Sequence, residues 1–121
     1  MKIELYKIYN PKEGKWASSY GWTKAGRVWH NIGALKVHLR AKLYYMMPTE
    51  YQMKDPAKIA EIVNRNKNND WQYKNCELVK ITENGITKSP VNELLKTMKC
   101  KNSNDIIYDR IVYLYGPNWI G

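Results

Sequence analysis

Two histidines are the side chains best suited to chemistry in this chain, and both lie in its most basic segment. His30 and His38 could act as general acid and base on a phosphodiester, with neighbouring cations binding the phosphates. A catalytic histidine is normally oriented by a third group, and no carboxylate lies near either of them in the sequence. We therefore predict that the chain is not an enzyme, with a small nuclease that uses His30 or His38 as an alternative.

Motifs for metals and nucleotides are absent from the sequence. Cys76 and Cys100 are the only cysteines, no CxxC or HxxxH pair occurs, and neither does a GxxxxGK[ST] or GxGxxG loop. We therefore predict no metal and no cofactor. The N-terminus does not resemble a secretory leader, so two thiols predict a reduced, cytoplasmic protein. Every apolar run is too short to span a bilayer, which predicts no membrane partner.

A mixture of cations and aromatic side chains characterises the first third of the chain. The net charge is +9, and residues 1–45 carry nine Lys and Arg against two acids, which gives +7. This asymmetry predicts an anionic partner for the N-terminal half. The residues that we expect to contact it are the cations, the histidines and one tryptophan of this segment: Lys15, Trp22, Lys24, Arg27, His30, Lys36, His38, Arg40 and Lys42.

Several kinds of partner would suit such a surface. Cations along a phosphate backbone, with rings such as Tyr20 stacked on bases, would hold single-stranded nucleic acid. On a duplex, the same cations would give salt-sensitive binding. An acidic protein surface would attract them equally. The rings of Trp16, Trp22 and Trp29 could instead belong to the core, and we expect all three to be buried.

A helix over residues 31–46 must position most of these cations. Asn31 is suited to its N-cap. Lys36 and Arg40 would lie on one shoulder of its apolar stripe, with His38 and Lys42 on the other. The stripe that we expect to be buried consists of Ile32, Leu35, Leu39, Leu43 and Met46. The remaining side is also apolar, and we expect it to be packed inside the domain, with a partner interface as the alternative: Ala34, Val37, Ala41, Tyr44 and Tyr45.

The other elements predict an α+β fold in one domain, residues 1–121, with a small antiparallel sheet packed by three or four short helices. The sheet combines an N-terminal and a C-terminal hairpin, the second turning at Asn84-Gly85. The expected strands are 3–9, 15–20, 27–29 and 71–82, followed by the strand after Gly85. Helices are expected after Asp55-Pro56 and Ser89-Pro90 and over 104–115, and the polar run 64–70 is expected to be an exposed loop.

A resemblance to a protein family rests on residues 9–40. These residues resemble small uncharacterised proteins of tailed bacteriophages that read W-T-K-x-G-[KR]-V-W and then G-x-L-K-x-H-L on a helix. The matching residues are Trp22, Thr23, Lys24, Gly26, Arg27, Val28, Trp29, Gly33, Leu35, Lys36, His38 and Leu39. The resemblance implies a non-enzymatic protein of the host cytoplasm that binds, and thereby inhibits, a host nucleic-acid-processing or anti-phage defence complex with an acidic surface. Direct binding of DNA or RNA is the alternative.

Overall fold

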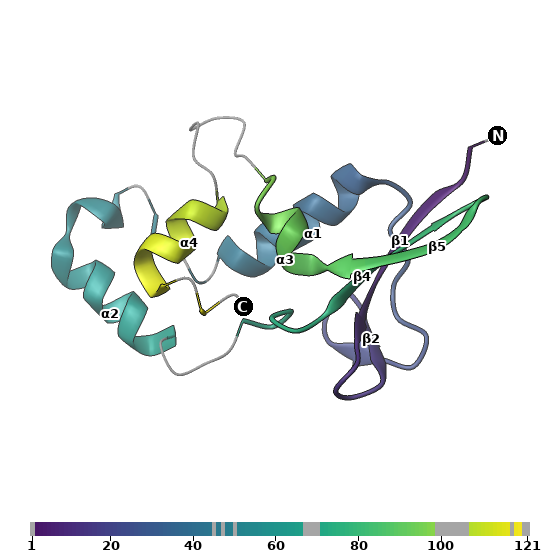
Figure 1. Cartoon of the computed structure of the whole chain (residues 1–121). Coiled ribbons are helices and arrows are strands. Elements are labelled where there is room, and N and C mark those ends of the chain that lie inside the picture. Colours follow the sequence, from purple (N-terminus) through teal and green to yellow (C-terminus); the bar gives the residue numbers. More distant parts are fainter. Residues whose placement is uncertain are drawn as a thin grey trace.

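A computed structural model of the chain shows an α+β fold, as predicted, with a five-stranded antiparallel sheet and four α-helices among the described residues (Figure 1). It describes residues 2–44, 46, 48–49, 51–66, 71–98, 107–116 and 118–119, with the backbone only at 44 and 107–110. The strands are β1 (Glu4–Asn10), β2 (Lys15–Ala17), β3 (Trp22–Thr23), β4 (Glu77–Thr82) and β5 (Gly85–Pro90). The helices are α1 (Ile32–Tyr44), the 3₁₀ turn η1 (Gln52–Lys54), α2 (Pro56–Asn66), α3 (Val91–Leu95) and α4 (Ile107–Tyr115).

The sheet has the order β3-β2-β1-β4-β5, so β1 lies at its centre. β1 pairs with β4 from Glu4 opposite Thr82 to Tyr9 opposite Glu77. Both predicted hairpins are confirmed, because β1 pairs with β2 and β4 pairs with β5. The second hairpin turns through Gly85, whose φ of +125° is a value that a residue with a Cβ rarely adopts.

The predicted strand over 27–29 is wrong. Trp29 forms only an isolated bridge with Tyr6, in which each backbone N–H donates to the other residue's carbonyl at 2.9 Å. The third strand of this unit is instead β3, which pairs with a β2 that ends at Ala17 rather than at residue 20. β2 ends there because the chain turns at once, with the Ser18 N–H donating to the Gly21 carbonyl at 2.8 Å.

The predicted strand over 71–82 is correct only for its second half. Residues 71–75 form turns, in which the Lys74 N–H donates to the Trp71 carbonyl and the Cys76 N–H donates to the Tyr73 carbonyl. Trp71 and Tyr73 are both buried in the core, although neither belongs to a strand. The apolar run 71–82 therefore combines a turn with a strand, and only its second part pairs in the sheet.

Helix α1 ends at Tyr44 rather than at residue 46, and it follows the prediction for the three leucines of its buried side, whereas Ile32 and Met46 are only partly buried. The Asn31 side-chain oxygen accepts the Ala34 N–H at 2.8 Å, which confirms the N-cap. Leu35, Leu39 and Leu43 are fully buried in the core shared with β1 and β4. On the second apolar side Val37 is 61% exposed and Ala41 is exposed too, so the predicted packing inside the domain is wrong there. The side chains of residues 44 and 45 lie outside the described part.

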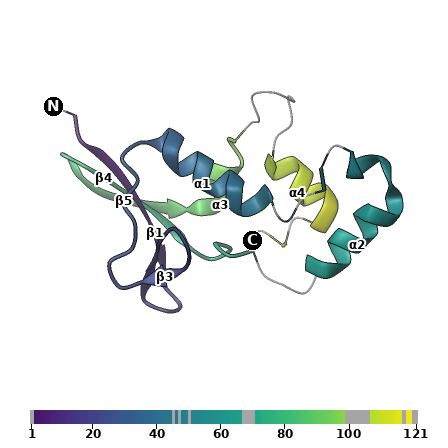
Figure 2. The ribbon, with the colours of Figure 1, turned by 180° about the vertical axis from the view of Figure 1, so that it is seen from behind.

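Helices α2 and α4 lie side by side at the end of the molecule away from the hairpins (Figures 1 and 2). The Asp55 carboxylate accepts the Ala57 N–H at 3.0 Å, which caps α2 as predicted. The expectation of an exposed loop from residue 64 onward is wrong for 64–66, which belong to α2. Asn66 is buried, and its amide is satisfied there because it donates to the Ile62 carbonyl at 3.0 Å and to the Tyr115 hydroxyl at 3.2 Å. Residues 67–70 lie outside the described part.

The two remaining helices also agree with the prediction. α3 follows Pro90 and buries Val91 and Leu95. The choice of a helix for the C-terminal segment is confirmed from residue 107 to residue 115, whereas 104–106 lie outside the described residues. None of the helices in the described part of the chain is both long enough and apolar enough to cross a bilayer.

Candidate interaction surface

The turn between β2 and β3, Ser18–Gly21, is held by two cations. The turn is closed by the Ser18 backbone N–H and hydroxyl, which both donate to the Gly21 carbonyl. Arg27 Nη1 donates to the Ser19 hydroxyl at 3.1 Å, and Lys42 Nζ donates to the Ser19 carbonyl at 3.3 Å. The segment after β3 and helix α1 are therefore both joined to this turn. We call Arg27 and Lys42, with the turn that they hold, the basic cluster.

The backbone that leads into Arg27 is fixed by a glycine. Gly26 has φ +70°, and a Cβ at this position would lie 2.3 Å from the Trp16 Cβ, a separation that no pair of side chains tolerates. The Gly26 N–H donates to the Thr23 hydroxyl at 2.7 Å, and the Arg27 N–H donates to the Ala17 carbonyl at 2.8 Å. The backbone that carries the Arg27 side chain is therefore fixed by hydrogen bonds at Gly26 and at Arg27 itself.

A histidine–tyrosine pair lies beside these cations. His38 Nε2 is 2.7 Å from the Tyr73 hydroxyl oxygen, and the imidazole packs against the Trp29 ring with 4.8 Å between centroids. Burial, and then Lys42 and Arg27, lower the pKa of His38 to about 4, so the ring is neutral at neutral pH. Burial raises the pKa of Tyr73. The protonated phenol therefore donates to Nε2, which leaves the imidazole proton on Nδ1.

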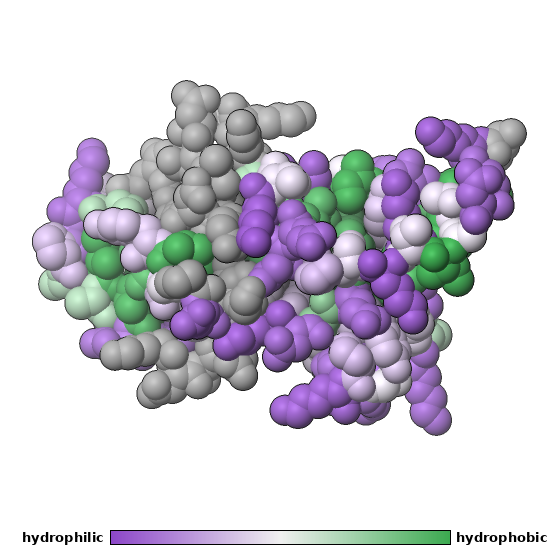
Figure 3. Space-filling model, viewed as in Figure 1, coloured by the Kyte–Doolittle hydropathy of each residue, from purple (hydrophilic) through white to green (hydrophobic). Residues whose placement is uncertain are grey.

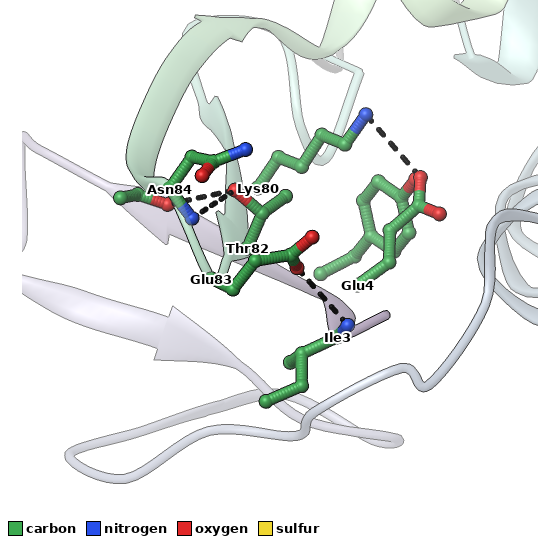
Figure 4. Close-up of polar contacts among 8 residues, drawn as sticks. Ile3, Glu4, Lys80, Thr82, Glu83 and Asn84 are labelled. Atoms are coloured by element: carbon green, nitrogen blue, oxygen red, sulfur yellow. Dashed lines mark hydrogen bonds and ion pairs between the residues drawn. The ribbon is translucent and has the colours of Figure 1, made fainter. Parts of the chain in front are cut away.

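Five cations of the first third make no ion pair with any other residue that the structure describes. No described carboxylate oxygen lies within 4.0 Å of their side-chain nitrogens, whereas Lys58 pairs with Glu61 at 3.5 Å and Lys80 pairs with Glu4 at 3.2 Å. Glu4, the first residue of β1, accepts hydrogen bonds from the Tyr6 hydroxyl and from Lys80, and these bonds lower the pKa of Glu4 (Figure 4). The cations concerned are Lys15, Lys24, Arg27, Lys36 and Lys42.

The structure separates the predicted contact residues on α1 into two groups. At about 100° per residue, Lys36 and Arg40 point from one side of the buried leucine stripe, and His38 and Lys42 point from the other. Arg27 shares Ser19 with Lys42, so it joins the second group. The predicted residues on α1 therefore lie on two sides of its leucine stripe, and the part of the predicted set that the described contacts define best consists of Arg27, His38 and Lys42.

Three further predicted residues are exposed but are not joined to the basic cluster. Lys15 lies on β2, Lys24 follows β3, and His30 precedes α1. No hydrogen bond or ring contact between described residues joins any of them to Arg27 or Lys42. Lys15 and Lys24 add positive charge to this end of the molecule.

The tryptophans are less uniform than predicted. Trp29 is buried, as expected, but Trp16 and Trp22 are only half-buried. The Trp16 ring lies against Tyr9 and under the ammonium group of Lys7, which is 4.1 Å from the ring centroid. The Trp22 ring meets Tyr73 edge to face, at 5.6 Å between centroids. All three rings are therefore occupied by contacts within the chain.

Sequence reasoning did not place Ser19 and Tyr73 in the site, and it considered Tyr20 only as a ring that could stack on bases. Tyr20 is 97% exposed, and it follows the Ser19 that Arg27 and Lys42 hold. The sequence offered one signal for it, because the S-S-Y-G run is turn chemistry that leaves the aromatic ring without a core position. Nothing local could have found Tyr73, which lies 35 residues from His38.

An apolar surface occupies the opposite end of the molecule. Figure 3 shows hydrophobic side chains gathered over α2 and α4, where a shallow groove is lined by Pro56, Ile59, Ala60, Val63, Tyr113 and Leu114. Within the described ranges no group of three or more His, Cys, Asp or Glu side chains is placed to hold a metal ion.

Comparison with known proteins assigns no family to the chain. No protein-family model, no curated protein and no solved structure matches it. Its function is therefore inferred from the chemistry of the basic cluster: two fixed cations that no described carboxylate neutralises, a neutral imidazole next to them, and one exposed phenol ring.

Proposed function

We propose that this chain is a small non-enzymatic host-interaction protein of tailed-phage type. It binds, and thereby inhibits, a host nucleic-acid-processing or anti-phage defence complex that presents an acidic surface. The observation that carries the proposal is the pair Arg27 and Lys42, fixed on the Ser19 backbone and side chain with no described carboxylate beside them. Cations that are already ordered lose little conformational entropy when an acidic surface docks on them.

The geometry of the histidines supports binding rather than catalysis. A general base needs an available lone pair and a pKa near the working pH. The Nε2 lone pair of His38 already accepts the Tyr73 hydroxyl proton, and the pKa of His38 is about 4. His30 is exposed, and no described side chain hydrogen-bonds to its ring to orient it. Neither imidazole has the surroundings that a small nuclease would require.

Direct nucleic-acid binding is the second candidate, and the same unpaired cations support it. The stacking mode has less support, because single strands are held by rings with open faces. Trp29 is buried, the Trp16 ring is covered by Lys7, and the Trp22 ring faces Tyr73. This leaves the phosphates as the main contact, with Tyr20 as the one exposed Tyr or Trp among the described side chains of the first third.

Capture from a bacterial lysate tests the proposal. The immobilised protein should retain one protein or complex in stoichiometric amount, both before and after the lysate is treated with nuclease. Retention of nothing would contradict the proposal, and retention that nuclease abolishes would favour the second candidate. In parallel, affinity for short DNA and RNA is measured against salt. A phosphate-based mode weakens steeply between low and physiological salt, and a flat response would exclude it.

A further inference from the structure

Tyr20 is the most exposed large hydrophobic residue among the described residues, and it lies in a turn that is held from both sides. The residue is 97% exposed. The turn is closed by two hydrogen bonds from Ser18 to Gly21, and Arg27 and Lys42 hold the intervening Ser19. The backbone at Tyr20 is therefore ordered before any partner arrives, although the ring itself has no packing contact in the core.

We propose that Tyr20 is the anchor residue of the interface, inserting its ring into an apolar pocket on an acidic protein surface while Arg27 and Lys42 meet carboxylates at the rim of that pocket. This inference rests on the proposed function and adds to it the contact residue and the partner class. Interface energy is concentrated in a few aromatic and arginine side chains near the centre of the contact, surrounded by polar groups that exclude water.

The energetics favour Tyr20 for this role over the other aromatics of the segment. A tyrosine ring buries a large area and loses only two side-chain torsions, so it contributes much binding energy at small entropic cost. Trp29 is already buried, and moving its ring into a partner would open the core. Tyr20 would lose no packing contact with the core if its ring entered a partner. The pre-ordered turn further reduces the cost of association.

An acidic protein fits the arrangement better than a nucleic acid does. Single strands are bound by successive rings on which successive bases stack, and among the described Tyr and Trp side chains of the first third only that of Tyr20 is exposed. A single aromatic side chain between cations matches one pocket surrounded by carboxylates. The cations identify the sign of the partner's charge, because no described carboxylate compensates them within the chain.

Photo-crosslinking in a nuclease-treated bacterial lysate tests the inference. A photoreactive phenylalanine derivative replaces Tyr20 in one variant and, as matched controls, Tyr51 or Tyr113 in two others, since these rings are 85% and 81% exposed. We expect position 20 to crosslink to the same protein that the wild type retains, and positions 51 and 113 not to do so. With that protein purified, Tyr20→Ala should weaken binding about tenfold or more, and Tyr51→Ala should leave it unchanged.

The possible results separate this inference from the proposed function. If the wild type retains a protein but position 20 gives no crosslink to it, or Tyr20→Ala binds it like the wild type, the anchor role is wrong and the proposed function stands. If position 20 crosslinks to nucleic acid in an untreated lysate and to no protein, the ring stacks on bases and the inference is overturned. If the wild type retains nothing, both proposals fail.

Discussion

His38 Nε2 lies 2.7 Å from the Tyr73 hydroxyl oxygen, and this contact joins α1 to the turn before β4. Burial and the two neighbouring cations keep this imidazole neutral. A charged imidazole here would place a third positive charge next to Arg27 and Lys42. Because the imidazole is neutral, the His38–Tyr73 pair can pack close to Arg27 and Lys42 without adding to the repulsion between their positive charges.

The first prediction concerns pH. The folded pKa of His38 is about 4 and the ordinary value is 6.5, so between these two values the unfolded chain binds more protons than the folded one. The free energy of unfolding should therefore fall as the pH falls from 6.5 to 4, by about 1–2 kcal/mol once solvent screening of the half-buried ring is allowed for. Denaturant unfolding at a series of pH values measures this change.

The two histidines provide a matched pair for that experiment. The Gln amide oxygen can still accept a hydrogen bond from the Tyr73 hydroxyl, so His38→Gln should keep the fold. Its free energy of unfolding should lose most of its dependence on pH between pH 6.5 and 4. His30 is exposed, so His30→Gln should retain it. If the free energy of unfolding changed equally with pH in the two variants, His38 would not be shielded from protonation in the folded state.

The second prediction concerns the glycine that leads into Arg27. Gly26→Ala forces a Cβ against the Trp16 Cβ at positive φ, and it should lower the free energy of unfolding by roughly 2–4 kcal/mol. Gly21→Ala is the control, because no atom lies within 4 Å of the added Cβ there. Thermal unfolding of the two variants measures the difference. A Gly26→Ala protein as stable as Gly21→Ala would contradict the described path of this segment.

The third prediction concerns the contact between α2 and α4. Asn66→Ala removes the donors to the Ile62 carbonyl and the Tyr115 hydroxyl, and loss of these buried bonds should cost about 1–3 kcal/mol of stability. Asn64→Ala alters an exposed position on the same helix and should change stability by less than about 0.5 kcal/mol. Chemical denaturation compares them, and a loss of similar size in both variants would argue against the buried network.

Local signals made part of this fold predictable from sequence. The spacing of Leu35, Leu39 and Leu43 and the cap at Asn31 lie within one helix, so the pattern contains all the information that α1 requires. The Asn84-Gly85 hairpin is equally local. By contrast, Trp71 and Tyr73 have the composition of a strand, and only the turn hydrogen bonds and their burial in the core determine their actual conformation.

The candidate site was predictable residue by residue but not as an arrangement. The cations were identified from charge alone, and most of them form no ion pair with a residue that the structure describes. Their grouping depends on contacts between distant positions, such as Lys42 with Ser19, 23 residues apart, and His38 with Tyr73, 35 residues apart. Sequence spacing could place Lys42 and Lys36 on different sides of α1, but it could not show which side the Ser18–Gly21 turn approaches.

The fourth prediction concerns the central claim, that Arg27 and Lys42 form the surface on which an acidic partner docks. Arg27→Gln/Lys42→Gln removes two charges from the basic cluster. The control Lys58→Gln/Lys88→Gln removes two charges from α2 and β5, far from it in the fold. Thermal unfolding should first establish that both double variants are folded.

The decisive measurement is quantitative capture from nuclease-treated bacterial lysate at physiological salt, with the wild type and both double variants immobilised at equal density. We predict that the wild type and Lys58→Gln/Lys88→Gln retain the same protein in stoichiometric amount, and that Arg27→Gln/Lys42→Gln retains at most about a tenth as much. Equal retention by the two double variants, or no retained protein on the wild type, would contradict the claim.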